Sequence, residues 1–534
     1  MTMPNDYDTD IAIVGAGIGG AYAAWRLGEH AAKSGSGNVA LFEMSDRVGG
    51  RLYSLNMPGM PHLPAELGGM RYFTSHGVTR ELVNTLGLPT LDFPGSDQQG
   101  NYSFVRNRHL RDADFRDPHK VPYQLSFNER GKTPEELIQY VIDTLIPQGS
   151  SALPAEWKNI RQTHALEGKK LHEYGWWSLM DWVLSKEAIE LINDAGGYDV
   201  PFRNWNAAEA MDVFRNNAPG RNTPSKMIAT GFQSLPETLV ERFMDCGGQY
   251  HQGHRLRSVT PLTQHGATGV ELVFETAPGE QRVIRARHAI LGLPKRALEL
   301  LGPDSALLRS PQVLSDINSV VSKPAIKLYL GYPYPWWQVL GIRGGKSVTD
   351  LETKQSYYFG SEQERPNGEP GNTNALLLAA YTDGRVLDYW YPLSRGDHFP
   401  GAANAFIEQG KSPLPEQCRA TKNQVFQAQK GMKKLHALKY IPQPYTAAYM
   451  DWSQDPYGGG YSFWQLGQNS SAIQKRMRRP IADAPIYVCG DSYSDLQGWV
   501  EGALTTTELL LQEHFDLPRP QWIPADYWSQ FTAG

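Results

Sequence analysis

The feature that most constrains the fold is a glycine-rich turn between an apolar strand-like run and a helix-like segment. The run Asp10–Val14 (DIAIV) is short and rich in β-branched residues, which is typical of a buried parallel strand. The turn after it reads Gly15-Ala16-Gly17-Ile18-Gly19-Gly20, a GxGxxG sequence. A helix-like segment, Ala21–Leu27, and a second apolar run, Val39–Phe42, complete a β-α-β unit. This unit predicts an α/β domain built on a parallel sheet.

The same turn predicts a dinucleotide site. Gly15, Gly17, Gly19 and Gly20 allow a tight turn, close approach of the backbone to a pyrophosphate, and tight packing of the helix on the strand. The helix N-terminus then faces the phosphate charge. Glu43 follows the second strand, where its carboxylate can accept hydrogen bonds from ribose hydroxyls. These five residues are therefore candidate cofactor contacts.

The rest of the chain alternates between helical and strand-like regions. Segments such as Thr133–Leu145 and Leu179–Asp194 predict a largely helical insertion after residue 111. A β-rich block covers residues 323–383. The C-terminal segment returns to the first pattern, with a strand at Ile486–Cys489 and a helix from about Gly498. This order indicates a nucleotide domain assembled from separated pieces, with other domains inserted between them.

Composition and motif content exclude several classes of protein. With 51 Lys+Arg against 56 Asp+Glu and a net charge of −5, the chain lacks the basic excess typical of nucleic-acid-binding proteins. Three cysteines without a CxxC pair predict neither a disulfide framework nor a zinc site, and we expect no metal. No HExxH or GxSxG sequence supports a hydrolase. The polar N-terminus shows no signal region and no run approaches the ~18 apolar residues of a membrane span, so we expect a soluble, cytoplasmic protein.

A second glycine pair decides which dinucleotide is expected. Arg47-Val48-Gly49-Gly50-Arg51 follows Glu43 and resembles the extended FAD fingerprint of the flavin amine oxidase family, whose arginine after the glycines approaches the cofactor phosphates. Two later segments, Gly231–Pro236 (GFQSLP) and Val488–Asp491 (VCGD), resemble the second FAD-binding piece and the late strand of that family.

The resemblance implies further contacts with FAD. Arg51, Leu256 and Asp491 contact the cofactor, the last through a carboxylate that meets the ribityl chain. Monoamine oxidases tether their flavin to a cysteine, but the segment Tyr457–Phe463 contains none. Non-covalent FAD is therefore implied.

On this resemblance the chain divides into three domains. Residues 8–51, 227–322 and 480–534 form a discontinuous Rossmann-like FAD-binding domain. Residues 52–110 and 323–479 form a mixed-sheet substrate-binding domain, and residues 111–226 form the helical domain.

Within the family, the closest likeness is to L-amino-acid oxidases. The residues that carry it are Leu67–Arg71 (LGGMR), Lys327, Gly344–Leu351, Tyr357-Tyr358 and Gly498-Trp499. The likeness implies that the FAD contacts also include Gly69, Met70, Arg71, Gly498 and Trp499.

The likeness also implies a role for each residue of the substrate site. Arg71 clamps the substrate carboxylate, which suits the planar fork of a guanidinium. The hydroxyl of Tyr358 holds the same group, with the register between Tyr357 and Tyr358 left open. Lys327 holds a water against the flavin. The Gly498 carbonyl accepts from the substrate amine and Trp499 forms part of the pocket wall. Two weaker aromatic candidates are Tyr461 and Trp464.

The implied activity is FAD-dependent oxidative deamination of L-amino acids to 2-oxo acids, ammonia and hydrogen peroxide. Large apolar or aromatic side chains are expected, because the matched segments offer no second cation for an acidic one; Asp495 or Glu501 leaves a basic one open. An amino-acid 2-monooxygenase, an amino-acid dehydrogenase and a non-catalytic FAD-binding protein remain alternatives. The expected partners are the amino acid and oxygen, with no nucleic acid or membrane, and a homodimer is left open.

Overall fold

The computed structural model describes residues 7–35, 37–94, 101–149, 151–198, 204–216, 224–264, 267–401 and 414–532. Its first large sheet has seven strands, of which five run parallel in the order β12-β2-β1-β15-β23. They are β12 (Gln249–His251), β2 (Val39–Phe42), β1 (Thr9–Val14), β15 (Glu280–Leu291) and β23 (Ile486–Val488). The first half of β15 pairs antiparallel with β14 (Ala267–Ala277), which pairs with β13 (Arg255–Gln264). The predicted Rossmann-like arrangement is therefore confirmed.

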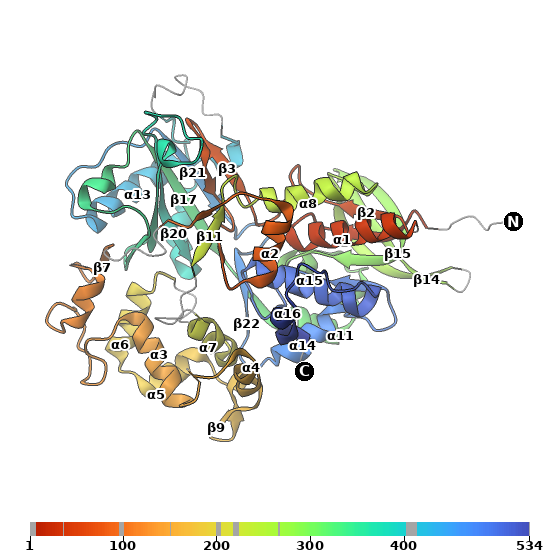
Figure 1. Cartoon of the computed structure of the whole chain (residues 1–534), viewed down its shortest axis with the longest axis horizontal. Helices are drawn as coiled ribbons and strands as arrows, with labels where there is room; N and C mark the ends of the chain where they lie inside the picture. The colour runs from red at the N-terminus through yellow and green to blue at the C-terminus, as the bar shows by residue number, and fades with distance from the viewer. Residues whose placement is uncertain are drawn as a thin grey trace.

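Helices from distant parts of the chain cover this sheet. On one side α1 (Ile18–Ser34) packs against both α8 (Ser234–Asp245) and α15 (Val500–Phe515), so the red and blue ends of the chain lie side by side in Figure 1. The buried face of α1 is rich in small residues, which lets it sit close to the sheet. Shorter helices complete the region: α2 (Gly77–Leu86), α9 (Lys295–Glu299), α10 (Ala306–Arg309), α11 (Pro311–Ile317), α14 (Ser470–Arg478) and α16 (Ala525–Thr532).

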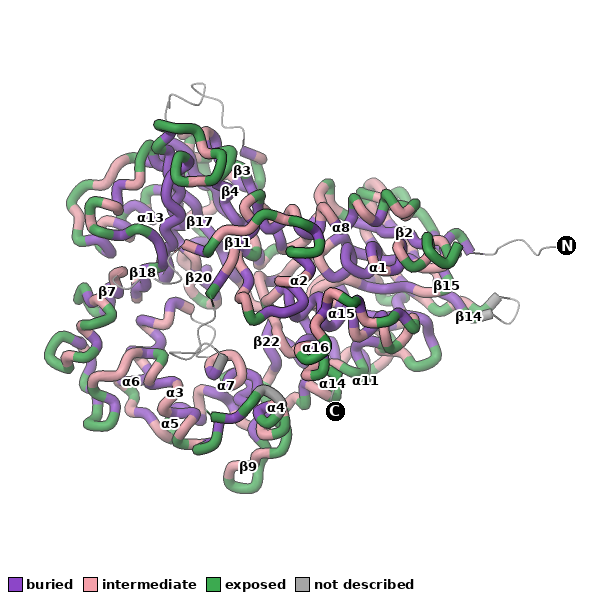
Figure 2. The backbone as a smooth tube through the Cα atoms, viewed as in Figure 1, coloured by how far each residue is buried: buried purple, intermediate pink, exposed green. Residues whose placement is uncertain are grey.

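A second seven-stranded sheet has the order β21-β17-β20-β19-β18-β7-β8 and is mixed. Its strands are β21 (Thr446–Asp451), β17 (Ala325–Tyr332), β20 (Ala375–Asp383), β19 (Gln355–Ser361), β18 (Lys346–Thr349), β7 (Ser103–Val105) and β8 (Arg108–Leu110). Every residue of β17 is buried, as the purple tube in Figure 2 shows, because both faces of this central strand are covered. The helices beside this sheet are α12 (Leu387–Leu393) and α13 (Lys422–Leu435).

The predicted helical insertion is present as a separate group of helices, drawn orange to yellow in Figure 1. It comprises α3 (Pro134–Leu145), α4 (Pro154–Thr163), α5 (Trp176–Val183), α6 (Lys186–Ala195) and α7 (Ala207–Asn216). The single helix expected over Leu179–Asp194 is wrong, since Ser185 caps the start of α6 by accepting from the Ala188 amide at 3.3 Å. No helix in the described ranges is long and apolar enough to cross a membrane.

Small sheets connect these regions. β3 (Ser54–Met57) pairs with β4 (Met60–Glu66), and β16 (Val320–Lys323) pairs with β22 (Tyr461–Trp464). β11 (Ser225–Ile228) lies between β5 (Tyr72–Phe73) and β6 (Thr90–Asp92), while β9 (Ala165–Leu166) pairs with β10 (Lys169–Lys170). Strands β5 and β22 both border the large cavity of the molecule.

Candidate active site

One cavity of about 1090 Å³ runs from the glycine-rich turn after β1 to the second sheet and the helical region. It collects nearly all of the residues that the sequence singled out. Those that line it are Gly15, Gly17, Gly19, Glu43, Arg51, Gly69, Met70, Arg71, Leu256, Lys327, Asp491, Gly498 and Trp499.

The glycine-rich turn leaves an open cradle at one end of this cavity. Gly15 has φ +97°, and a Cβ there would lie 2.7 Å from the carbonyl oxygen of Gly292, so only glycine fits. By contrast, a Cβ on Gly17 or Gly490 would meet no atom within 4 Å. Gly17 is the N-cap of α1 and provides no side-chain cap, which leaves the helix N-terminus available to an anion.

Glu43 stands beside this cradle at the end of β2. One carboxylate oxygen accepts from the Ala16 amide at 2.7 Å, and the other accepts from the amide and hydroxyl of Ser45 at 2.9 and 2.8 Å. These contacts hold a buried carboxylate at the cavity wall, and the oxygen that accepts from Ala16 retains capacity for a further donor.

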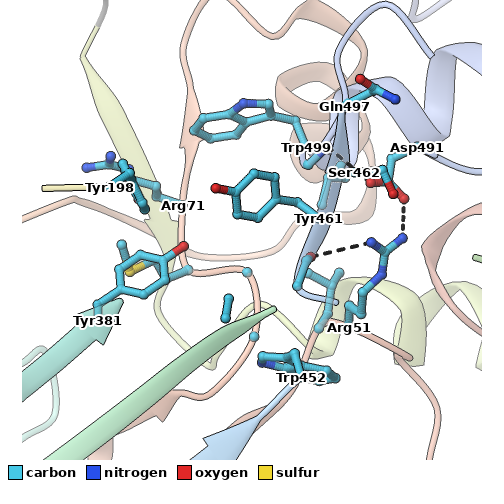
Figure 3. A pocket seen from close by; sticks show the side chains of 18 of the residues that line it. Arg51, Arg71, Tyr198, Tyr381, Trp452, Tyr461, Ser462, Asp491, Gln497 and Trp499 are labelled. Atoms are coloured by element: carbon cyan, nitrogen blue, oxygen red, sulfur yellow. Dashed lines mark hydrogen bonds and ion pairs between the residues drawn. The ribbon is translucent and has the colours of Figure 1, made fainter. Parts of the chain in front are cut away.

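Arg51 and Asp491 join two distant segments at the middle of the cavity. They form an ion pair, drawn as a dashed line in Figure 3, and the second oxygen of Asp491 accepts from the Gly498 amide at 3.1 Å. The open cradle at the uncapped start of α1 fits the phosphates of FAD, and the Glu43 carboxylate fits its ribose. Arg51 and Asp491 offer donors and acceptors that fit the ribityl chain.

Arg71 follows the turn after β4 and enters the cavity from the opposite side. Its guanidinium carbon lies 4.9 Å from the ring centre of Phe93 and 5.8 Å from the rings of Phe73 and Tyr357. Within the described ranges, no carboxylate and no hydrogen-bond acceptor contacts the guanidinium. Cation–π contacts hold the group in place, and its five donors have no acceptor among the residues that the structure describes. Such a site is ready to bind an anion.

Lys327 points from β17 toward the same turn. Its ammonium donates to the carbonyl oxygens of Glu66 at 3.0 Å and Gly68 at 2.6 Å, and it lies 4.8 Å from the ring centre of Tyr381. Burial lowers the pKa of Lys327, although the Glu66 carboxylate opposes that shift. The lysine is thus a buried cavity group and not an edge residue that reaches solvent.

Aromatic side chains form the wall between these two ends. Figure 3 shows the rings of Trp499 and Tyr461 between Arg71 on one side and the Arg51–Asp491 pair on the other. Trp499 is the N-cap residue of α15, and its ring packs against that of Phe73 with 4.8 Å between the ring centres. Tyr461 donates its hydroxyl to Asp383, so its ring is fixed in the wall.

The prediction for Tyr358 is wrong. Its hydroxyl lies in a buried network, 2.8 Å from Ser347 Oγ and 2.6 Å from His436 Nε2, and it does not line the cavity. Successive residues of a strand face opposite sides, and the cavity side of β19 belongs to Tyr357. Burial raises the pKa of Tyr358, as expected for a core hydroxyl.

Two other candidates also lie outside the cavity. A Cβ on Gly20 would fall 1.9 Å from the carbonyl oxygen of Gly15, so this glycine serves the packing of α1 and does not touch the cradle. Trp464 is fully buried and donates to the Ser494 carbonyl oxygen at 3.1 Å.

The sequence reasoning missed two tyrosines. Tyr381 ends an apolar run in β20, and Tyr198 follows a glycine pair after α6; their rings meet edge to face at 5.4 Å near Arg71. The only signal in the sequence was that Tyr381, which carries a polar hydroxyl, ends an apolar run. Tyr461, a weaker candidate, does line the cavity.

Comparison with known proteins agrees with this geometry. The profile of a family described as flavin-containing amine oxidoreductase matches residues 18–402 and 421–508. Aplysianin-A of Aplysia kurodai is 26% identical over 96% of this chain and 91% of its own length. Achacin of Lissachatina fulica is 25% identical over 95% of this chain and 93% of its own.

Two further similar proteins have names that describe different substrates. The L-amino acid oxidase Bs29 of Bothriechis schlegelii is 23% identical over 92% of this chain and 87% of its own length. A solved structure of putrescine oxidase bound to putrescine superposes with a TM-score of 0.65 at 16% identity, covering 95% of this chain and 99% of that one. The second likeness shows the fold alone.

Proposed function

Since the chain belongs to the flavin-containing amine oxidoreductase family, we propose that it is an FAD-dependent L-amino-acid oxidase. The proposed reaction consumes an L-amino acid, oxygen and water, and it yields a 2-oxo acid, ammonia and hydrogen peroxide. The observation that carries the proposal is Arg71, a cavity arginine without a protein carboxylate in the described ranges. A simple amine has no anion to offer such a group, whereas an amino acid has its carboxylate.

The residues around the cavity give the substrate a defined orientation. The Arg71 guanidinium binds the α-carboxylate through two parallel hydrogen bonds. The carbonyl of Gly498, on the other side of the cavity, accepts from the neutral amine. Trp499 and Tyr461 exclude water from the α-carbon between these two points. Orientation of this kind supplies a large share of the rate enhancement.

FAD, when bound, supplies the acceptor for the hydrogen that leaves the α-carbon. The open glycine cradle and Glu43 support FAD binding, and the lack of a cysteine among the described residues that line the cavity supports a non-covalent attachment. The charge of Lys327, close to the turn that carries Gly69 and Met70, favours the reduction of oxygen to an anionic species.

The test is an anaerobic titration of the purified flavoprotein with twenty L-amino acids, their D-enantiomers and putrescine. We expect the flavin absorbance to bleach with L-amino acids and to recover in air with stoichiometric peroxide. An amide product would indicate a monooxygenase, and bleaching without recovery in air would indicate a dehydrogenase. Bleaching by putrescine and by no amino acid would refute the role of Arg71. If none of these compounds bleaches the flavin, the catalytic assignment fails.

A further inference from the structure

Helix α2 begins without a cap of its own. Its N-cap residue is His76, whose side chain makes no capping hydrogen bond, and the first turn carries no acidic residue. A helix N-terminus left in this state within a buried region would expose several amide donors without acceptors. The missing acceptor comes from another helix, α15.

Glu501, in the first turn of α15, supplies that acceptor. Its carboxylate accepts from the Val78 amide at 3.0 Å, from the Thr79 amide at 2.7 Å and from the Thr79 hydroxyl at 2.7 Å. A fourth donor is the hydroxyl of Tyr527 in α16, at 2.7 Å. Glu501 is fully buried and does not line the cavity, so its four hydrogen bonds go to protein groups alone.

This contact joins the two halves of the substrate site. Glu501 lies two residues after Trp499, and the α2 start lies a few residues after Arg71 and Phe73. The His76 ring, at the N-cap of α2, makes T-shaped contacts with Trp499, at 5.0 Å between ring centres, and with Phe73, at 5.3 Å. Burial lowers the pKa of His76, which favours the uncharged ring in this aromatic contact.

The third helix of the junction adds a second restraint. Tyr527 packs directly over the start of α2, where a Cβ on Gly77 would lie 2.6 Å from the tyrosine ring. Through Tyr527, helix α16 therefore packs against the start of α2 and also donates a hydrogen bond to Glu501. Both contacts fix the same junction from outside the cavity.

We propose that Glu501 is a positioning residue that sets the distance between Arg71 and Trp499 and thereby the fit of the amino-acid substrate. The proposal rests on the proposed function for its substrate, while the mechanical link between α2 and α15 stands on the contacts above. A carboxylate is required because it accepts from four donors at once. Loss of that acceptor releases the α2 start from α15, and both sides of the clamp then shift.

The experiment compares Glu501→Gln with a matched control, Glu508→Gln. Glu508 lies on the same helix, is also fully buried, and also accepts from a tyrosine, Tyr22 OH at 2.7 Å. An amide keeps the shape of the side chain but turns one of its two oxygens into a donor, which then faces either the donors of Val78 and Tyr527 or those of Thr79. We expect kcat/KM for the best L-amino acid to fall roughly tenfold to a hundredfold in the Glu501 variant, mostly through KM. The Glu508 variant keeps both constants within about twofold of the wild type.

A second readout does not depend on turnover. Hydrogen–deuterium exchange of the flavoprotein should accelerate at residues 77–80 and 499–503 in Glu501→Gln and at neither segment in Glu508→Gln. Tyr527→Phe removes one of the four donors and should raise KM about twofold to threefold, so it tests the link even if Glu501→Gln does not fold. Unchanged KM and unchanged exchange at both segments in the folded variants would overturn the proposal. If the wild type oxidises no amino acid but the exchange changes as expected, the proposed function fails and the link between the helices stands.

Discussion

Two arginines near the same cavity have opposite surroundings. Arg161, from α4, is 5% exposed and forms ion pairs with Asp495 at 2.9 Å, Glu209 at 3.1 Å and Asp212 at 3.4 Å. Although burial works the other way, these carboxylates raise the pKa of Arg161. Arg71 is surrounded by aromatic rings and has no carboxylate partner in the described ranges.

The difference indicates that Arg161 stabilises the fold, whereas Arg71 binds a ligand. The Arg161 cluster joins the helical region to the loop before α15, and three carboxylates of the protein compensate the charge of Arg161. Arg71 lacks that compensation, and a charge near a low-dielectric cavity without a partner costs stability unless a ligand completes it. The two sites therefore make contrasting predictions for stability and for turnover.

The largest effect is expected at Arg71. Arg71→Ala should retain FAD and its thermal midpoint but lose about 4 kcal/mol of transition-state binding, roughly a thousandfold in kcat/KM. Arg71→Lys, which keeps the charge but not the fork, should recover part of the loss. Steady-state kinetics and flavin absorbance give both quantities. An unchanged kcat/KM would remove Arg71 from the substrate site.

Arg161 should show the reverse pattern. Arg161→Met leaves three buried or half-buried carboxylates without their cation, which should cost about 3 kcal/mol of stability and lower the thermal midpoint by about 3 °C. Adding Glu209→Gln should restore part of the midpoint, because it removes one of the uncompensated charges. Thermal melts of the holoprotein decide the matter. A variant with full stability and impaired KM would instead place Arg161 in the substrate site.

The charge difference between the two sites also predicts selectivity. Glu209 and Asp495 line the cavity, and Arg71 is the group assigned to the α-carboxylate, so an acidic side chain meets further negative charge. L-Glutamate and L-aspartate should have kcat/KM values about thirtyfold below those of large apolar or aromatic L-amino acids, which corresponds to about 2 kcal/mol. A peroxide assay over the twenty amino acids measures this. Best activity on an acidic amino acid would contradict the charge argument.

The smallest effect is expected at Lys327, whose ammonium donates to the backbone carbonyls of Glu66 and Gly68. Lys327→Met should slow the reoxidation of reduced FAD by oxygen about tenfold, or about 1.4 kcal/mol, and should change flavin reduction by substrate less. Stopped-flow absorbance separates the two half-reactions. Equal losses in both would show that the lysine acts through the shape of the turn and not through its charge.

Local sequence was sufficient where one short pattern determines the structure. The strand expected at Val39–Phe42 is β2 residue for residue, because a buried parallel strand needs a continuous apolar run. Two glycines of the first turn lie where their backbone requires them: Gly15 has a positive φ, and Gly20 lies too close to the Gly15 carbonyl oxygen for a side chain. Motif order along the chain was enough to bring together residues as distant as Arg51 and Asp491.

The same reasoning failed where a side chain's direction depends on pairing between strands. The pairing of β19 with β20 is irregular on both sides of Tyr357 and Tyr358. A shift of one residue moves a side chain to the other face of the sheet, so the sequence could not choose between the two tyrosines. Glu501 was considered as a partner for a basic substrate, but its carboxylate is used by α2, a long-range contact that no local pattern reveals.

The strand order of the first sheet has a consequence for biosynthesis. β1 is made long before β23 and α15, yet its neighbour β15 lacks one parallel partner until β23 is made, and α15 is one of the two helices that pack against α1. At typical translation rates, on the order of a minute separates these elements. During that time the nascent chain exposes apolar strand edges and cannot complete the cradle for FAD, so cofactor capture must wait for β23 and α15 and needs protection from aggregation until then.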